Sequence, residues 1–304
     1  MTDQMSRGHT LCARKLNKSY GKQPVLHNLD LEIEPGHIYG LIGRNGAGKT
    51  TLLSILTGQN TKNSGEVSYG GQPVWDNPRA LGDICFTREL SPSSEVAALK
   101  AEDYLMAARL FCPRWDADYA DTLIRKFDID VKKRLNRMSK GQMSAVTIVA
   151  ALASRAPLTF LDEPAAGLDV VMRERFYRLL LDDYAQTGRT FVISTHIIEE
   201  AAGVFERVIV LDEGRVIADA LTEDLVGEFR YVSGSAAAVD EALAAGPAPL
   251  QTQTVGSHKI AAVRGDDALF DRLAANEALT VEGMNLQNVF VALSAMAMRR
   301  GKPC

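Results

Sequence analysis

The sequence feature that most constrains this chain is a glycine-rich octapeptide at residues 43–50. It reads Gly43-Arg44-Asn45-Gly46-Ala47-Gly48-Lys49-Thr50, with the spacing of a phosphate-binding loop: glycine, four residues, then glycine, lysine and threonine. A short apolar stretch precedes it at 37–42, as expected of a buried parallel strand, and residues 49–57 are expected to form a helix. Glycines let successive backbone N–H groups converge on phosphate oxygens, and a helix N-terminus favours an anion.

The residue types in this loop suggest separate tasks in phosphate binding. Lys49 is expected to reach the β- and γ-phosphates, and Thr50 to place its hydroxyl on Mg²⁺. The alternative, a glycine-rich turn that binds nothing, fits less well, because the three anchor positions and both flanking segments have the required character. The other residues predicted to contact the nucleotide from this loop are Gly43, Asn45, Gly46, Ala47, Gly48 and Thr51.

Composition limits the classes of protein to which this chain can belong. A length of 304 residues allows one large domain with a small one, or two medium domains. The net charge of −4 gives no indication of a dedicated nucleic-acid binder. Four scattered cysteines favour free thiols over a zinc site or a disulfide framework. No run is long and apolar enough to span a membrane and no signal peptide is recognisable, so a membrane function would need another chain.

Alternating strand and helix patterns predict an α/β fold around the loop. Half-buried strands are expected at about 10–34, a hairpin at 64–74, a strand at 83–90, a helical block at about 93–153, and another helix at about 197–205. Buried strands are predicted at 157–162 and 190–196. Because ligands bind at the carboxyl ends of parallel strands, the Asp162 carboxylate is expected to lie at such a site, with Glu163 next to it. The strand at 190–196 again ends in a polar group, His196. Taken singly, Asp162 and Glu163 fit a strand-end turn equally well, and His196 a structural histidine.

The character of the sequence changes near Phe229. Clusters of small and helix-breaking residues occupy 233–238 and 246–249, and no structure is assigned to them. Beyond them we expect a strand at 258–263, a helix at 267–276, a strand at 279–284 and a final helix at 286–298. At about seventy residues, this α+β appendage lies near the lower size limit for independent folding, so it is expected to lean on the main domain.

Taken together, these motifs resemble the ATP-binding subunit of an ABC transporter over about residues 11–225. Met138-Ser139-Lys140-Gly141-Gln142 is similar to the family's signature loop, and Gly167-Leu168-Asp169 to the loop that crosses between two such domains. Tyr20 matches the aromatic residue that stacks on adenine, although alone it is better explained as an ordinary sheet or turn aromatic. Asp162 matches the magnesium-organising acid, Glu163 the catalytic acid and His196 the switch histidine.

The resemblance implies a fold and a division of labour. It implies a P-loop NTPase core, with a mixed sheet and helices on both faces, an antiparallel β-subdomain and a helical signature subdomain at about 90–155, all within residues 1–230. Residues 231–304 are expected to form the small α+β accessory domain described above. ATP and Mg²⁺ are the implied cofactors, with catalysis by Glu163, His196 and Lys49 and the metal held by Thr50, Asp162 and Glu89. The residues implied to face the nucleotide of a second copy are Ser139, Gly141, Gln142 and Asp169.

Partners and location also follow from the resemblance. The resemblance implies two partners: a second ATPase chain, identical or paralogous, and a separate polytopic permease. It also implies that this chain is cytoplasmic and peripheral on the inner face of the cell membrane. No nucleic acid is expected as a partner. Segments 285–293, 110–116 and 154–157 resemble exporter-type members. The alternative is a soluble ABC ATPase that acts on ribosomes or DNA, which the single phosphate loop and the compact helical block disfavour. A module that binds ATP without hydrolysis is countered by Glu163 and His196.

The chain departs from the family pattern in the signature loop and after the 83–90 strand. Lys140 replaces the usual glycine, and Met138 replaces the usual leucine. Glu89 takes the place of the usual glutamine and Arg88 that of the usual proline. We expect function to survive, because Lys140 adds positive charge near a phosphate face and Glu89 can still reach Mg²⁺ or water.

Overall fold

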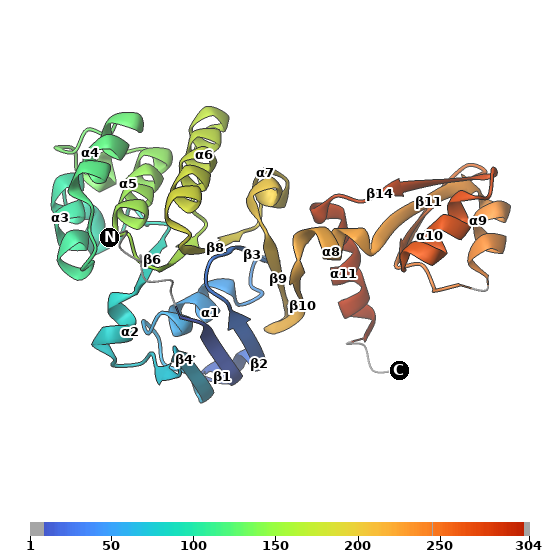
Figure 1. Cartoon of the computed structure of the whole chain (residues 1–304), viewed down its shortest axis with the longest axis horizontal. Helices are drawn as coiled ribbons and strands as arrows, with labels where there is room; N and C mark the ends of the chain where they lie inside the picture. Colours follow the sequence, from blue (N-terminus) through green and yellow to red (C-terminus); the bar gives the residue numbers. More distant parts are fainter. Residues whose placement is uncertain (1–8, 245, 301–304) are drawn as a thin grey trace, which may run out of the picture.

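The structure is a computed structural model that describes residues 9–244 and 246–300. Figure 1 shows a central layered body with a block of helices at one end and a smaller α+β unit at the other. No helix within the described residues combines the length and apolarity needed to cross a bilayer.

A six-stranded mixed sheet forms the centre of the larger body, in the order β10-β9-β3-β8-β7-β6. The strands β9, β3, β8, β7 and β6 run parallel, and β10 is antiparallel to β9. Their carboxyl ends therefore meet at one edge of the sheet. The bounds are β3 Ile38–Ile42, β6 Ile84–Arg88, β7 Leu158–Asp162, β8 Thr190–Thr195, β9 Arg207–Asp212 and β10 Arg215–Leu221.

One face of the central sheet packs against a helix and an antiparallel sheet. The helix is α1, Lys49–Leu56, and the antiparallel sheet has the order β2-β1-β4-β5. Along β3, Tyr39 and Leu41 point into this core, because alternate side chains of a strand lie on opposite faces. The strands of the antiparallel sheet are β1 Leu11–Tyr20, β2 Gln23–Ile33, β4 Ser64–Tyr69 and β5 Gln72–Pro73.

The opposite face packs against two helices, α5 (Lys140–Ala153) and α6 (Val170–Thr187). Helices α3 (Ala101–Phe111) and α4 (Ala117–Lys126) are stacked outside them (Figure 1). Ile38 and Ile42 of β3 face this second core. Helix α5 is buried all round from Met143 onward, which explains its continuous apolar sequence. Shorter elements are α2 Pro78–Gly82, α7 Ile198–Ala201 and 3₁₀ turns at Glu95–Ala98, Leu135–Arg137 and Ala202–Val204.

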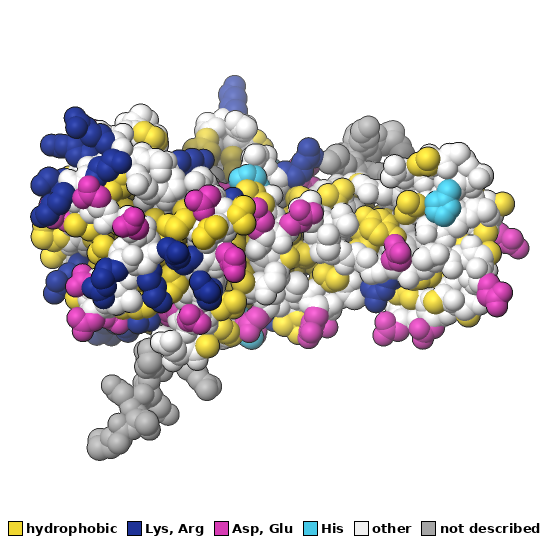
Figure 2. Space-filling view, turned by 90° about the horizontal axis from the view of Figure 1, so that it is seen from above, with side chains coloured by type: hydrophobic (Ala, Val, Ile, Leu, Met, Phe, Trp, Pro, Cys, Tyr) yellow, Lys and Arg dark blue, Asp and Glu magenta, His cyan; other side chains and the backbone are white. Residues whose placement is uncertain are grey.

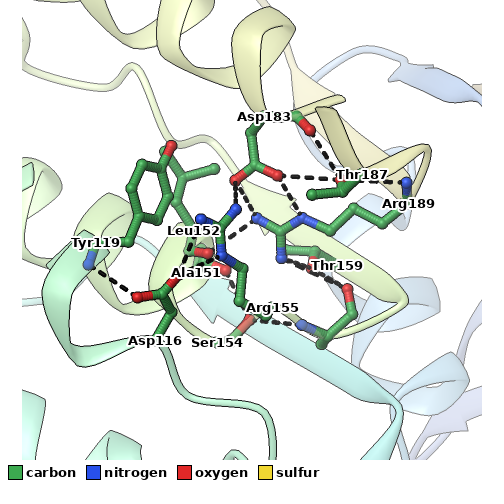
Figure 3. A network of polar contacts seen from close by, with 11 residues as sticks. Asp116, Tyr119, Ala151, Leu152, Ser154, Arg155, Thr159, Asp183, Thr187 and Arg189 are labelled. Atoms are coloured by element: carbon green, nitrogen blue, oxygen red, sulfur yellow. Dashed lines mark hydrogen bonds and ion pairs between the residues drawn. The ribbon is translucent and has the colours of Figure 1, made fainter. Parts of the chain in front are cut away.

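A buried ionic network joins the helical block to the sheet (Figure 3). Asp183 of α6 accepts hydrogen bonds from Arg189, at 2.7 Å from Nη2 and 3.0 Å from Nε, and pairs with Arg155 Nη1 at 3.2 Å. Arg155 also binds Asp116, the residue that caps α4, and lies 3.9 Å from the centre of the Tyr119 ring. The network therefore connects α4, the end of α5, α6 and the start of β8.

The C-terminal unit contains a four-stranded antiparallel sheet in the order β12-β13-β11-β14, with α9 and α10 packed on one face. The predicted elements at 258–263, 267–276 and 279–284 correspond to β13, α10 and β14. The bounds after β10 are α8 Thr222–Gly227, β11 Phe229–Ser235, α9 Ala236–Leu243, β12 Gln251–Val255, β13 His258–Arg264, α10 Asp267–Ala274, β14 Leu279–Gly283 and α11 Leu286–Arg300.

Three elements of this unit were missed by sequence reasoning. Strand β11 and helix α9 span the small-residue cluster at 233–238. The strand is held by pairing with β13 and β14. The helix starts where the Ser235 hydroxyl accepts the Ala238 N–H and so caps an alanine-rich segment. Strand β12 is a mostly exposed edge strand of polar residues, which gives little hydrophobic signal. The helix expected at 197–205 is also wrong in extent, since α7 covers only Ile198–Ala201 before a 3₁₀ turn.

The final helix belongs to the core of the larger body. Leu286, Val289 and Leu293 of α11 join the same buried cluster as Leu225 and Phe229, together with α7 and β9 residues. Helix α11 therefore provides the contact by which residues 231–304 were predicted to pack on the main domain. The boundary at residue 230 stays a prediction.

Candidate nucleotide-binding site

The loop between β3 and α1 has the backbone that its glycines predict. Gly46 and Gly48 have positive φ angles of 84° and 104°, a region in which residues with a side chain are strained. The Ala47 N–H donates to the Arg44 carbonyl at 3.1 Å, which closes a tight turn, and α1 begins at Lys49. The N-terminal N–H groups of α1 therefore lie directly after this turn.

Lys49 is almost fully buried at the base of the loop. Its Nζ donates to the carbonyl oxygens of Gly43 at 2.8 Å and Arg44 at 3.4 Å. Burial lowers the pKa of the ammonium group, and the negative charges of Glu163 and Asp162 act in the opposite direction. Among the described residues, the hydrogen-bond acceptors of this ammonium group are carbonyl oxygens, which it can exchange for the stronger attraction of a phosphate oxygen.

Asp162 lies at the end of β7, where it contacts both the loop helix and the next strand. Its Oδ2 accepts the Thr50 hydroxyl at 2.7 Å, and its Oδ1 accepts the Ser194 hydroxyl. Ser194 is directly opposite Asp162 in the β7–β8 register. Sequence reasoning missed Ser194 as a site residue; the available signal was a hydroxyl close to the end of a buried strand that was already predicted to lead into the site.

Glu163 and His196 form a hydrogen-bonded pair beside Asp162. His196 Nδ1 lies 2.9 Å from Glu163 Oε2. Glu163 has a positive φ of 52°, which is strained for a residue with a side chain, and its N–H donates to the Ser194 carbonyl at 3.0 Å. The carboxyl edge of the sheet thus holds a carboxylate whose histidine partner directly follows the adjacent strand, β8.

The phosphate loop borders a hollow of about 380 Å³. This volume is within the usual range for small-ligand sites. The hollow lies over the helix N-terminus and next to the Glu163 carboxylate. Its lining residues are Val25, Arg44, Asn45, Gly46, Gly48, Lys49, Thr50, Thr51 and Glu163. Thr50 and Asp162 supply hard oxygen ligands of the kind that Mg²⁺ prefers, so the residues fit a magnesium–nucleotide complex.

Tyr20 lies at the end of β1 with half of its surface exposed. Its hydroxyl accepts a 2.6 Å hydrogen bond from Asn60 Nδ2, and the Lys18 ammonium lies 4.9 Å from the centre of its ring. Tyr20 is not one of the described residues that line the hollow. Its predicted stacking on a base therefore stays a prediction.

The signature-loop residues form a second group at the N-terminus of α5. Ser139 caps this helix and forms a reciprocal capping box with Gln142. A side-chain carbon at Gly141 would lie 2.5 Å from the Gly167 carbonyl oxygen, so the crossing loop requires glycine there. Asp169 caps α6 by accepting the N–H of its third residue at 2.8 Å.

Glu89 belongs to this second group in the structure. Its Oε1 pairs with Lys140 Nζ at 2.9 Å. The magnesium role predicted for Glu89 therefore requires its carboxylate to change partner from Lys140 to the cation near Thr50 and Asp162.

The fold and the arrangement of Lys49, Thr50 and Asp162 at the carboxyl edge of the sheet define a P-loop nucleoside triphosphatase. The family model described as ABC transporter matches residues 26–166. The aliphatic sulfonates import ATP-binding protein SsuB of Corynebacterium glutamicum is 32% identical over 238 residues, 76% of this chain and 91% of the relative. The chain belongs to the ABC transporter ATP-binding family and is an ATPase.

Two further relatives show how varied the family's named roles are. The Nod factor export ATP-binding protein I of Burkholderia lata is 31% identical over 223 residues, 70% of this chain and 71% of the relative. The ABC transporter ATP-binding protein YtrB of Bacillus subtilis is 29% identical over 216 residues, 71% and 73% of the two chains. One relative is named for import and another for export, so family membership leaves the direction of transport open.

Solved structures show the same fold. An ATP-binding subunit of an ABC transporter is 26% identical, with a TM-score of 0.62 over 71% of this chain and 91% of the other. A dimeric post-hydrolysis ATP-binding cassette bound to ADP and Pi has a TM-score of 0.61 at 23% identity, which bears on the fold alone.

Proposed function

We propose that this ATP-binding subunit hydrolyses ATP in a head-to-tail dimer and drives a separate membrane permease in the direction of export. The observation that carries the proposal is the convergence of Lys49, Thr50, Asp162, Glu163 and His196 at one edge of the sheet. These five residues come from three separate segments of the chain, and a structural role in one segment does not require the others.

The chemistry assigned to this edge is phosphoryl transfer to water. The loop N–H groups and Lys49 bind the phosphates and orient the γ-phosphate. Thr50 and Asp162 would hold Mg²⁺, which neutralises phosphate charge when bound. Glu163 accepts a proton from the attacking water, and His196, hydrogen-bonded to Glu163 at 2.9 Å, fixes the direction of that carboxylate.

Replacing Glu163 by glutamine tests this assignment. Glu163→Gln keeps the shape of the side chain but removes the base, so ATP turnover should fall by about 10²- to 10⁴-fold while ATP binding persists. Glu199→Gln is the matched control, because Glu199 is an exposed glutamate in the short helix after His196. Turnover that falls equally in both variants, or in neither, would refute Glu163 as the base.

The second group of residues supports a dimer. Ser139, Gly141 and Gln142 lie at a helix N-terminus. Ser139 and Gln142 bond to each other, Gln142 Oε1 also accepts from Lys133 Nζ at 3.3 Å, and Gly141 packs against the Gly167 carbonyl. We assign this helix N-terminus to the γ-phosphate of ATP bound by another copy. Two copies placed in this way form an isologous pair around two ATPs, which hydrolysis then loosens. Light scattering of Glu163→Gln should show dimers with ATP and monomers without it.

An exposed apolar patch at the end of α3 supports the proposal that this chain binds a permease. Met106, Leu110 and Phe111 are 60%, 80% and 82% exposed. Figure 2 shows Lys and Arg side chains gathered at the same end of the molecule, where α3 and α4 lie, whereas acidic side chains predominate at the C-terminal end. We assign the patch to a cytoplasmic segment of the permease, with the chain peripheral on the inner face of the cell membrane.

Co-purification tests the permease assignment. The Glu163→Gln protein is isolated in detergent with ATP from its native cells, and the bound chains are identified. A polytopic membrane protein in stoichiometric amount supports the proposal, and Leu110→Ser with Phe111→Ser should abolish its capture. Ribosomal or DNA-repair partners without a membrane protein would favour the soluble alternative instead.

Export is proposed from the resemblance of segments 285–293, 110–116 and 154–157 to exporter-type members. Apart from its first residue, segment 285–293 forms the start of α11, which packs on the nucleotide-binding body through Leu286, Val289 and Leu293. The direction can be measured in inside-out vesicles that contain the chain and its captured permease. ATP-dependent accumulation of a compound in the lumen, absent with Glu163→Gln, supports export, and ATP-dependent depletion contradicts it.

A further inference from the structure

Two residues that depart from the family pattern lie in contact with each other. Lys140 stands where the signature loop usually has glycine, and Glu89 stands where glutamine is usual after β6. They are 51 positions apart in the chain, yet Lys140 Nζ lies 2.9 Å from Glu89 Oε1. The two substitutions replace an uncharged pair of residues by a cation and an anion that compensate each other.

Glu89 follows a strand that ends at the edge of the site, and Lys140 packs on the crossing loop. Glu89 follows Arg88, which is in register with Asp162 across β6 and β7, so Glu89 leaves the sheet at the edge that carries Asp162 and Glu163. Lys140 is the first residue of α5. Its stem crosses the Gly167 backbone, where an added side-chain carbon would lie 2.5 Å from Lys140 Cγ. This packing directs the ammonium group toward Glu89.

The exposure of the pair indicates a weak contact. The side chain of Lys140 is 54% exposed and that of Glu89 is 41% exposed. Water and salt screen ion pairs in such positions, so they add little stability. A divalent cation attracts a carboxylate more strongly than an exposed ammonium does, because it carries twice the charge and binds oxygen directly.

We infer that Lys140 is a positioning residue that holds the Glu89 carboxylate away from the magnesium site until the cation with its nucleotide is bound. The inference rests on the proposed MgATP site. When Glu89 turns to the cation, Lys140 is released at the N-terminus of α5, where it adds positive charge to the surface assigned to the second copy's triphosphate. The movement of Glu89 from Lys140 to the cation thus couples the chain's own MgATP site to the N-terminus of α5, the surface assigned to the second copy's triphosphate.

The test measures the Mg²⁺ concentration needed for half-maximal binding of a fluorescent trinitrophenyl-ATP. The full chain is used with Glu163→Gln, which prevents turnover, at protein concentrations where light scattering shows monomers. Lys140→Met should lower the half-maximal Mg²⁺ concentration by about two- to fivefold, the factor that corresponds to the coupling of an exposed ion pair. Lys140→Arg keeps the charge and should match the parent.

The second half of the test repeats Lys140→Met in a Glu89→Gln background. Without the Glu89 charge, Lys140→Met should leave the Mg²⁺ requirement unchanged. Equal shifts in both backgrounds, or no shift in either, would overturn the positioning role while leaving the proposed function intact. A Glu163→Gln parent that binds no nucleotide at any Mg²⁺ concentration would overturn the proposed function itself.

Discussion

Replacement of Asp183 by asparagine should destabilise the chain strongly. The Asp183 side chain is fully buried, and its carboxylate neutralises Arg189, which is 4% exposed, and Arg155, which is 19% exposed. Asparagine retains the size of the side chain but leaves the buried Arg189 without a counter-charge, and leaves Arg155 with Asp116 as its anionic partner (Figure 3). Loss of one partner from a buried ion pair costs about 3–5 kcal/mol of unfolding free energy.

The magnitude can be expressed as a melting temperature. For a chain of this size, 1 kcal/mol shifts Tm by about 2 °C, so Asp183→Asn should lower Tm by about 6–10 °C. Urea denaturation measures the free energy, and scanning calorimetry measures Tm. Asp182→Asn is the matched control, because Asp182 is the exposed preceding residue of the same helix and its replacement should shift Tm by about 1 °C or less.

Equal shifts for the two variants would refute this reasoning. Such a result would mean that carbonyl oxygens alone satisfy Arg189. Arg189 already donates to the Leu152 carbonyl at 3.0 Å and to the Ala156 carbonyl at 3.5 Å, so the comparison separates charge compensation from hydrogen bonding.

Four further variants probe the second group and Tyr20. Gly141→Ala places a carbon 2.5 Å from the Gly167 carbonyl oxygen, so it should cost about 1–3 kcal/mol in urea denaturation and reduce dimer formation with ATP. Ser139→Ala removes the cap of α5 and should cost about 1 kcal/mol in the same assay. Tyr20→Ala should weaken ATP binding by about 5- to 100-fold if the ring stacks on adenine, measured by calorimetric titration, whereas Tyr20→Phe should retain affinity.

Local sequence was sufficient to predict the phosphate loop and most of the larger body. The loop is defined by consecutive residues whose conformations are set by glycine, so its turn and the start of α1 agree with the pattern. The strands that lead to Asp162 and His196 were predictable because both are buried apolar runs. Where hydrophobic contrast was low, at β11, α9 and β12, prediction failed, because neighbouring strands and a single serine cap decide those elements.

The sequence by itself determined the chemical character of this protein: a phosphate loop, two acids at a strand end and the family to which they belong. Only the tertiary structure decided which side chains meet. Ser194 reaches Asp162 through strand register, Glu89 pairs with Lys140 rather than with the metal residues, and α11 packs on the nucleotide-binding body. These contacts join residues far apart in the chain, and they depend on side-chain directions that no local pattern encodes.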